Sequence, residues 1–445
     1  MCCARFQANF CALKALWRLS FISVALNGFS ELTQVLMSKF WSCRLLAGIL
    51  LWAHVCKAQT QLSLPEAVNY ALAHRPELRA ADAKVTALSD LQRQAGAVPN
   101  PRFLFRKEDL RTQTSAFGEN SQTYWEGSQL LEVSGKRGGR IEVAKAETAQ
   151  SRLGAQLTRR EITLSVRRSY WIAKATQLLA NLYEQDGHYS GEMITYHEAR
   201  FHEGKIAEVD LLRVRLQGQQ IQAAAASAQL DSEKAQLDLA REMNASPDAR
   251  WVLSEDLIRV EEPLPVPAGS DPATLRIEGQ IAQEAIAQAQ ARVKLEKANG
   301  RTDLLFTGGY KRDTENIDTP LAGVQFDLPL FNRNQAAVLA ARAETDAVQA
   351  SYEATRNQIL AEAALARRDY QMRRDQFLNT FQPLKDQAVE ISEISRAAYQ
   401  AGGLDLVRLL DAERARVDAE LSYVRALESY HLSVVDLNYT EGIDQ

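Results

Sequence analysis

Three histidines that lie close together in the chain, His188, His197 and His202, are the first residues whose type suggests chemistry, because imidazole is a common metal ligand. Their spacings of nine and five residues do not place them on one helix face, as an i,i+4 pair would be. This part of the chain has no cysteine, and Met193 is the one methionine nearby, so soft ligands are scarce. The sequence therefore predicts no metal site here.

Motifs of catalysis and of cofactor binding are also missing from the sequence. The segment GKRGGR, residues 135–140, is glycine-rich and basic but lacks the spacing of a phosphate-binding loop. We expect a joint between a strand and a helix there. The net charge of −4 on 445 residues argues against nucleic acid as a partner. The sequence predicts a protein that is not an enzyme and has no cofactor.

Glycine interrupts two helix-forming stretches at matching places. The stretches are ARFHEGKIAEVDLLRVRLQ at 199–217 and AYQAGGLDLVRLLDAERAR at 397–415, which contain Gly204 and the pair Gly402-Gly403. Similar apolar residues follow the glycine in both. We expect a tight turn between antiparallel helices, with glycine in the left-handed conformation just after the helix end. A helix kink is the alternative.

An offset of 198 residues relates the residues around the two breaks, which predicts two tandem repeats. Each repeat is expected to contain a helix, two strands, a long helix, a break and a helix, so the fold class is mainly α with a small β part. The first repeat would span 59–258, with strands at about 98–133, and the second 273–445, with strands at about 301–331. A proline-rich linker, 259–272, would join them.

Two local signals support these elements. Ser63 as N-cap, Pro65 in the first turn and Glu66 at the capping-box spacing predict where the first helix begins. In the second strand pair, apolar residues alternate with others from Val324 to Leu330, which predicts one apolar face per strand.

The N-terminal part of the sequence reads as a secretory leader. MSKFWSCRLLAGILLWAHVCKA, residues 37–58, combines basic residues, an apolar run too short to span a bilayer and a small-x-small end. Residues 1–36 would be an upstream extension. All five cysteines precede Gln59, so the mature chain would have no thiol. Lipidation of Cys56 is the weaker alternative, because the residues before it do not form a lipobox.

Four strands are too few to close a barrel, and open strands in a membrane would leave backbone groups unpaired. Either the strands lie in a soluble sheet, or several chains pool them. A trimer would supply about twelve strands, within the range of outer-membrane barrels. Tyr124, Trp125 and Tyr310 lie near strand ends, where aromatic residues meet the membrane interface.

Together these features resemble the TolC family of outer-membrane efflux channels, and the resemblance covers essentially the whole mature chain. It rests on LSLPEAVNYALAHRPEL, on the joints LLEVSGKRGGRIEVAKAE and FDLPLFNRNQAAV, and on YQAGGLDLVRLLDAE. The stretch EVSGKRGGRI is similar to the branch of the family that is paired with heavy-metal-cation exporters.

The resemblance implies a homotrimer whose 12-stranded β-barrel lies in outer-membrane lipid and continues as a long periplasmic α-helical barrel. It implies a passive exit duct, docked to a periplasmic adaptor (a membrane fusion protein) and served by an inner-membrane RND-type pump. It implies no catalysis. The sequence does not name the exported substrate, for which heavy-metal cations are the candidate.

The resemblance also places the periplasmic entrance at the turns marked by Gly204, Gly402 and Gly403. Acidic residues that commonly narrow and charge this entrance in the family match Asp411 and, in the first repeat, Asp210. In a trimer, such residues would form rings of carboxylates that favour cations. The alternative is a solvated helix face with local ion partners.

Two positions depart from the family pattern at this entrance. Arg408 stands where the family has an acid, and Leu404 replaces a basic residue that often follows the second glycine. We therefore expect any charge lock that holds the entrance closed to use other residues, such as Arg213 and Arg408.

Two other classes of protein remain as alternatives. A periplasmic coiled-coil adaptor or scaffold without a pore would share the long helices. It usually has one helical hairpin between β-rich domains, unlike the two repeats seen here. An enzyme on a helical scaffold is disfavoured by the missing motifs.

Overall fold

The chain from Thr60 to Gln445 packs as one unit. The computed structural model describes residues 60–108, 121–259, 262–267 and 269–443. The predicted leader, its upstream extension and all five cysteines lie outside the described residues, as does part of the proline-rich linker.

Helices make up most of the described chain, because its long stretches are rich in alanine, leucine and glutamine and poor in proline. The longest helix, α4, has 67 residues, which corresponds to a length of ~100 Å. A short π-helical segment, η1, joins α8 to α9. The helical elements are α2 (Leu64–His74), α3 (Pro76–Ala95), α4 (Lys136–His202), α5 (Glu208–Met243), α6 (Pro272–Leu275), α7 (Ile277–Asn299), α8 (Gln335–Gln376), η1 (Phe377–Phe381), α9 (Gln382–Gln400) and α10 (Leu406–Glu441).

The first helix begins where the sequence predicts. The Ser63 hydroxyl accepts a hydrogen bond from the Glu66 N–H, and the Glu66 carboxylate accepts one from the Ser63 N–H, which completes a capping box. The helical stretch is divided at Arg75 into α2 and α3. The residue before a proline avoids the helical conformation, and Arg75, which precedes Pro76, has ψ 123°.

The strands form two separate sheets. A four-stranded antiparallel sheet has the order β2-β3-β5-β6, so β3 of the first half pairs with β5 of the second half. A two-stranded parallel sheet joins β1 to β4; its three-residue strands are too short to show an alternating pattern in the sequence. The strands are β1 (Thr60–Leu62), β2 (Arg102–Glu108), β3 (Gln122–Leu131), β4 (Trp251–Leu253), β5 (Leu304–Arg312) and β6 (Asp318–Gln325).

The last strand is shorter than predicted. β6 ends at Gln325. The expected apolar strand face from Val324 to Leu330 therefore includes Val324, but the prediction is wrong for the residues after Gln325. Pro329 has no N–H to donate to a ladder, and the chain between the strand and α8 is irregular. Its apolar side chains are exposed instead, and Phe331 reaches 95% exposure.

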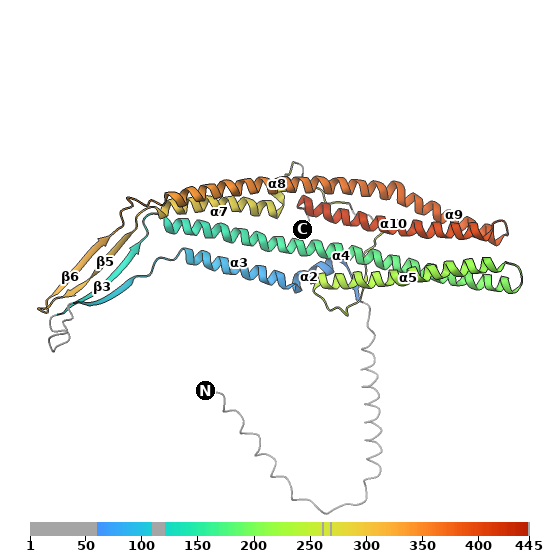
Figure 1. Cartoon of the computed structure of the whole chain (residues 1–445), viewed down its shortest axis with the longest axis horizontal. Helices are drawn as coiled ribbons and strands as arrows, with labels where there is room; N and C mark the ends of the chain where they lie inside the picture. The colour runs from blue at the N-terminus through green and yellow to red at the C-terminus, as the bar shows by residue number, and fades with distance from the viewer. Residues whose placement is uncertain (1–59, 109–120, 260–261, 268, 444–445) are drawn as a thin grey trace, which may run out of the picture. The chain divides into compact units, whose positions relative to one another are not determined.

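The helices pack side by side within the unit. α4 packs against α3, α5, α7 and α10, while α8 packs against α7 and α10. Figure 1 shows that the turn from α4 to α5 and the turn from α9 to α10 lie together, at the end of the helices away from the four-stranded sheet. The strand pairs of the two halves are therefore neighbours at one end of the unit, and their helix turns are neighbours at the other end.

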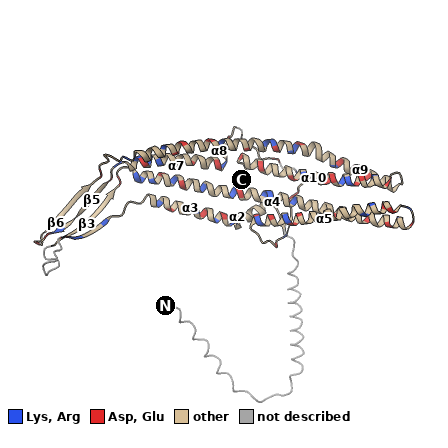
Figure 2. Ribbon diagram, in the orientation of Figure 1, with Lys and Arg blue, Asp and Glu red and all other residues tan. Residues whose placement is uncertain are grey.

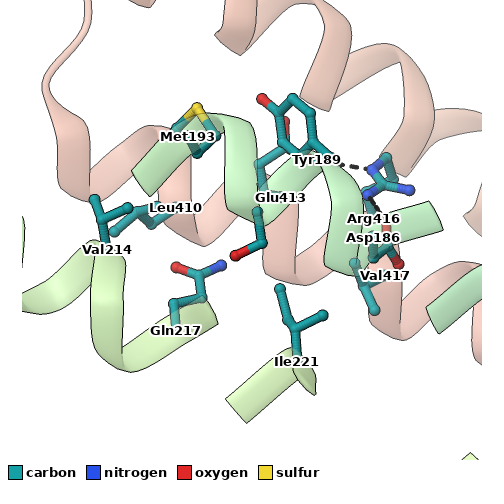
Figure 3. Close-up of a pocket in the computed structure, with 11 residues that line it drawn as sticks. Asp186, Tyr189, Met193, Val214, Gln217, Ile221, Leu410, Glu413, Arg416 and Val417 are labelled. Carbon is teal, nitrogen blue, oxygen red and sulfur yellow. Dashed lines mark hydrogen bonds and ion pairs between the residues drawn. The ribbon is translucent and has the colours of Figure 1, made fainter. Parts of the chain in front are cut away.

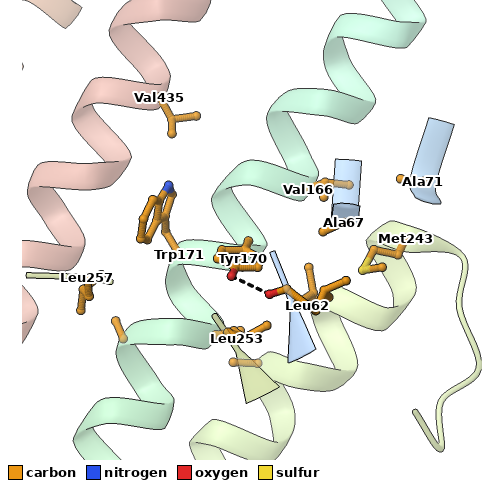
Figure 4. Packing of buried hydrophobic residues seen from close by; sticks show 14 of the residues in the cluster. Leu62, Ala67, Ala71, Val166, Tyr170, Trp171, Met243, Leu253, Leu257 and Val435 are labelled. Atoms are coloured by element: carbon orange, nitrogen blue, oxygen red, sulfur yellow. Dashed lines mark hydrogen bonds between the residues drawn. The ribbon is translucent and has the colours of Figure 1, made fainter. Parts of the chain in front are cut away.

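The apolar core lies where the small parallel sheet meets α2, α4, α5 and α10 (Figure 4). Tyr170 is fully buried; its hydroxyl donates to the Leu62 carbonyl at 2.8 Å and accepts from the Glu255 N–H at 3.2 Å. The indole of Trp171 stacks on His431, with ring centroids 4.0 Å apart. Fully buried alanines such as Ala67 allow the helices to approach closely.

Charged residues are spread along the helices. Figure 2 shows acidic and basic residues interspersed on α4, α5 and α10, and fewer of them on the strands. In the part of the chain that the structure describes, no helix is both long enough and apolar enough to cross a membrane.

The Tyr170 hydroxyl gives a test of this core. Tyr170→Phe leaves the buried Glu255 N–H without its partner, so we expect a loss of ~1–3 kcal/mol of stability and a lower melting temperature by circular dichroism. Tyr183→Phe, which removes a hydroxyl from a half-buried residue of the same helix, should change little. An unchanged melting temperature in Tyr170→Phe would show that this hydrogen bond does not stabilise the core.

Candidate functional site

The two helix turns share one backbone geometry. Gly204 and Gly402 both have left-handed φ, +73° and +79°. In the first turn, the Gly204 N–H bonds to the Phe201 carbonyl and the next N–H bonds to the Arg200 carbonyl. The second turn repeats both bonds at Tyr399 and Ala398. This is the Schellman arrangement that ends a helix and reverses the chain, so both stretches are turns rather than kinks.

Gly403 is not required by this geometry. A side chain added there would make an ordinary contact with the Ala398 carbonyl at 3.7 Å, and its φ is not in the left-handed range. The conformational requirement for glycine therefore lies at Gly204 and Gly402.

The charged residues predicted at the entrance pair locally. Arg213 lies 3.5 Å from Asp210 on α5. Arg408 lies 3.4 Å from Asp405, which also caps α10 by accepting a hydrogen bond from the Arg408 N–H. Arg408 thus pairs with a residue at the start of α10. Asp210, the acid after the first turn, pairs with Arg213 instead.

Asp411 lies on the exposed side of α10. It borders a groove of about 520 Å³ between α5 and α10, together with Arg213 and Arg414. An exposed carboxylate beside a groove can face water or cations.

The three histidines have different environments. His188 and His202 are exposed, whereas His197 is fully buried. Among the residues that the structure describes, no group of three histidine, cysteine or acidic side chains is placed to hold a metal ion. His197 instead lies against the second turn: its Nε2 is 2.7 Å from the Tyr399 hydroxyl.

A buried charged cluster lies about two helical turns after the start of α10. We call it the Glu413 cluster (Figure 3). Glu413 is 4% exposed and accepts hydrogen bonds from Arg396 and from the Ser392 hydroxyl at 3.0 Å, both on α9. Its other partner is Arg416, at 3.2 Å. Arg416 also lies 2.5 Å from Asp186 of α4, so the cluster joins α9 and α10 to the first pair of helices.

The aromatic ring of Tyr189 completes this cluster. The Arg396 guanidinium lies 4.2 Å from its centroid, a distance at which the ring attracts the cation. Beside the cluster is a cavity of about 30 Å³, lined in part by Tyr189, Met193 and Gln217. Its lining is mostly apolar, although Asp186, Glu413 and Arg416 are among the lining residues, so the ion pairs border this cavity.

The cluster depends on the charge of Glu413. Burial raises the pKa of Glu413, but the hydrogen bonds from Arg396 and Ser392 and the charge of Arg416 outweigh it and hold the pKa below its usual value of 4.5. A carboxylate with a lowered pKa contributes stability above its unfolded-state pKa and loses it as the pH falls through the folded-state value. The Glu413 cluster should therefore be intact above about pH 4.5.

Sequence reasoning missed this cluster, although a signal for it is present. Buried or half-buried positions of α10 recur at alternating spacings of three and four residues, as in a helix seam that faces other helices. Leu406 and Leu409 begin this seam, and Glu413, Arg416 and Glu420 continue it. Charged residues at seam positions indicate buried ion pairs.

Comparisons with known proteins agree with this architecture. The family model described as "Outer membrane efflux protein" matches residues 67–245 and 280–440. The cobalt-zinc-cadmium resistance protein CzcC of Cupriavidus metallidurans is 26% identical over 386 residues, which cover 83% of this chain and 88% of that protein. The nickel-cobalt-cadmium resistance protein NccC of Alcaligenes xylosoxydans xylosoxydans is 28% identical over 309 residues, 68% of each.

The fold is also similar to that of solved channels. The outer-membrane channel OprN superposes with a TM-score of 0.72 at 20% identity, over 85% of this chain and 89% of that one.

Replacing the buried carboxylate tests the Glu413 cluster. Glu413→Gln removes the counter-ion that the half-buried Arg396 and Arg416 share, while Arg416 keeps Asp186 and Glu420. We therefore expect a loss of ~1–3 kcal/mol and faster trypsin cleavage near the α9–α10 turn. Glu393→Gln makes the same chemical change at an exposed position of α9 and is the control. Equal melting temperatures and cleavage rates for the two variants would contradict the stabilising role.

Proposed function

Because the chain belongs to the outer membrane efflux protein family, we propose that it works as a homotrimer with a periplasmic adaptor and an inner-membrane RND-type pump. The protein is an outer-membrane efflux channel with a periplasmic helical part, and it is not an enzyme.

The four-stranded sheet is the observation that supports a trimer. Its order, β2-β3-β5-β6, places β2 and β6 at the two edges. Phe103 and Phe105 on β2 are 74% and 57% exposed, and Val324 on β6 is 55% exposed. Exposed apolar side chains are suited to lipid, but the backbone groups of an edge strand are unstable there unless they are paired. Pairing β6 of each copy with β2 of the next would close a barrel of about twelve strands in outer-membrane lipid.

The two repeats then have a simple meaning. We take 59–258 and 273–445 as the repeats and 259–272 as their linker. Each would supply one strand pair to the barrel and one pair of long antiparallel helices to a periplasmic tunnel. The β3–β5 pairing, which runs from Leu131 and Leu304 to Thr123 and Arg312, supports this division because it joins one strand pair to the other.

The entrance of the tunnel would lie at the turns of Gly204 and Gly402. In a trimer these turns would surround one opening, and the exposed carboxylate of Asp411 would recur once per copy. A ring of carboxylates at a narrow point favours cations over anions. Asp210 would contribute less, because Arg213 lies 3.5 Å away.

Heavy-metal cations are the cargo class that we propose. The support is the similarity to two proteins named for resistance to cobalt, zinc, nickel and cadmium. Among the described residues no cluster of metal ligands stands ready to bind such an ion. The channel would therefore offer a charged path rather than a binding site, and the pump would select the ion.

Reconstitution tests the assembly. Protein extracted from outer membranes should have the mass of three chains by light scattering in detergent, and it should conduct in planar lipid bilayers. A monomer that never conducts would overturn the trimeric channel and would favour a periplasmic adaptor or scaffold.

The role of Asp411 gives a separate prediction. Asp411→Asn should lower the cation-to-anion permeability ratio and weaken block by Zn²⁺ or Cd²⁺ by severalfold, because one carboxylate per copy is lost from the entrance. Asp418→Asn removes an exposed carboxylate from the same helix two turns farther from Gly402 and should change both quantities much less. Similar effects of both changes would mean that Asp411 does not set the selectivity.

A further inference from the structure

One face of the four-stranded sheet carries exposed aromatic side chains. Phe105 pairs with Trp125, and Trp125 pairs with Tyr310 on the next strand. Residues that pair directly lie on the same face of a sheet, and so do residues an even number of positions apart along one strand. Tyr310 and Phe306 both belong to β5, so Phe306 shares this face. In the proposed barrel, this face meets the lipid.

The apolar surface of this face continues past the end of the last strand. Phe306 pairs with Val324 of β6. After Val324, the side chains at every second residue remain apolar, and Phe326, Leu328 and Leu330 are 53%, 67% and 64% exposed. They lie between the end of β6 and the start of α8. The apolar surface therefore reaches the joint where the chain passes from the sheet to the helices (Figure 1).

Three exposed arginines follow the apolar surface at this joint. Arg137 lies in the first turn of α4, Arg301 precedes β5 and Arg333 precedes α8. Within the described parts of the chain, none of the three forms an ion pair with a carboxylate. The Arg137 Nε donates to the Gly96 carbonyl at 2.6 Å, and the Arg333 Nε donates to the Pro329 carbonyl at 3.0 Å. Their terminal guanidinium nitrogens remain available for an anion.

The carboxylates at the joint do not balance its cations. Asp303 is paired with Lys136 at 2.6 Å, and Glu132 is paired with Arg140. Asp327 is exposed and is the third carboxylate. The joint residues, 130–140, 299–303 and 326–334, contain five cationic and three acidic side chains, so each chain has an excess of two positive charges here.

Two contacts hold the parts of the chain that carry these arginines together. The ion pair of Lys136 with Asp303 joins the first turn of α4 to the segment before β5. Gly300, in that segment, lies against the Arg333 carbonyl, and a side chain at Gly300 would come within 2.3 Å of its oxygen. This close approach requires glycine and joins the segment before β5 to the start of α8. The three arginines, one from each of these parts, therefore lie together at the joint.

Lipid with an anionic headgroup matches this combination of apolar surface and arginine. A guanidinium group binds phosphate oxygens through paired hydrogen bonds, and the apolar side chains beside it suit acyl chains. The helical part of the protein is periplasmic, so the leaflet that meets the joint is the periplasmic one.

A neighbouring copy of the chain would not supply the missing negative charge. In the proposed barrel, β6 would pair with β2 of the next copy, so the segment before β2 would lie beside the segment after β6. That segment, residues 96–101, has the sequence GAVPNP and contains no acidic residue. The charge at the joint therefore favours lipid over a second copy.

We propose that the joint between the sheet and the helices binds anionic phospholipid of the periplasmic leaflet. Arg137, Arg301 and Arg333 bind the headgroup phosphates, and Leu328 and Leu330 lie beside the acyl chains. The proposal rests on the proposed function, in which the sheet crosses the outer membrane and the helices lie in the periplasm. It adds a class of lipid as a partner and a depth at which the channel is anchored.

Native mass spectrometry of the protein purified from outer membranes tests the preference for lipid charge. Phosphatidylglycerol should bind at least about tenfold more tightly than phosphatidylcholine with the same acyl chains, because each arginine near an anionic headgroup contributes about fivefold. Higher salt should weaken the phosphatidylglycerol complex. Inorganic phosphate should not displace the lipid, since it has no acyl chains. Displacement by phosphate alone would indicate a site for a soluble anion and would overturn the proposal.

Removing the charge of the three arginines should remove the preference. Arg137→Gln, Arg301→Gln and Arg333→Gln, made together, should bind phosphatidylglycerol at least about tenfold more weakly and phosphatidylcholine as before. Replacing the same three arginines by lysine keeps the charge, so most of the preference should return. That return separates loss of charge from loss of fold.

A matched control removes three arginines elsewhere. Arg79→Gln, Arg152→Gln and Arg368→Gln change exposed residues of α3, α4 and α8. Each lies about four or more helical turns from the joint. This variant should keep the wild-type preference for phosphatidylglycerol, and an equal loss in both triple variants would contradict a site at the joint.

Leu328→Trp distinguishes lipid from a neighbouring copy as the cover of this surface. Trp125 is first replaced by Trp125→Phe, because it lies on the lipid-facing side of the sheet. The fluorescence of the new side chain should be quenched in nanodiscs made with lipids that carry bromine near the headgroup. Fluorescence that brominated lipids leave unchanged would mean that the next copy covers the joint, and would overturn the proposal.

Lipid binding and conductance separate the inference from the function on which it rests. If the trimer conducts but binds phosphatidylglycerol and phosphatidylcholine equally, the lipid site is overturned and the channel stands. If the protein never conducts but keeps an arginine-dependent preference for phosphatidylglycerol, the surface binds anionic lipid and the proposed channel assembly is wrong.

Discussion

The pairing of β3 with β5 is the constraint on which the arrangement of the two halves depends. This ladder joins segments that are far apart in the sequence, from Leu131 and Leu304 to Thr123 and Arg312. Once the two strand pairs lie side by side, the helices that follow them, α4 and α8, leave the sheet in the same direction, with α7 packed against both. Their lengths then carry both helix turns to the same distant end (Figure 1). The contact between His197 and Tyr399 depends on this alignment of the two halves, which the packing of α4 against α7 and α10 also supports.

Helices of this length cannot be held by a single core, and different contacts hold different parts. Near the middle, aromatic and aliphatic side chains such as Tyr170, Trp171 and Leu427 are fully buried. Toward the turns, polar contacts join the apolar ones: the Glu413 cluster and the contact of His197 with Tyr399 lie in the same part of the helices as the buried Leu211, Val214 and Leu409. Apolar burial stabilises in proportion to the area removed from water, whereas a polar contact adds only ~1 kcal/mol net, because water can replace either partner.

The sequence predicted the helices, the two strand pairs and the left-handed glycines because each has a local cause. The capping box at Ser63 and the glycines at the turns follow from conformational preferences of single residues. The small β1–β4 sheet and the Glu413 cluster depend on contacts between distant segments, and three-residue strands leave no local pattern. The predicted end of β6 was wrong because apolar residues alternate with others up to Leu330, although Pro329 cannot donate a hydrogen bond to a neighbouring strand. The pairing of Arg408 with Asp405 could not be predicted without knowing that α10 begins just after Asp405.

Polar contacts among the buried apolar side chains near the turns would suit the proposed duct, whose entrance would open at that end. If the turns were joined by apolar side chains alone, opening them would expose apolar surface to water at ~25 cal/mol per Å², with no compensation. Hydrogen bonds and ion pairs exchange partners with water instead. The fully buried ring pairs around Trp171 cannot exchange in this way, so they keep the middle of the helices fixed. In the proposed function, opening would be confined to the end that carries the turns, and the rest of the protein would stay folded.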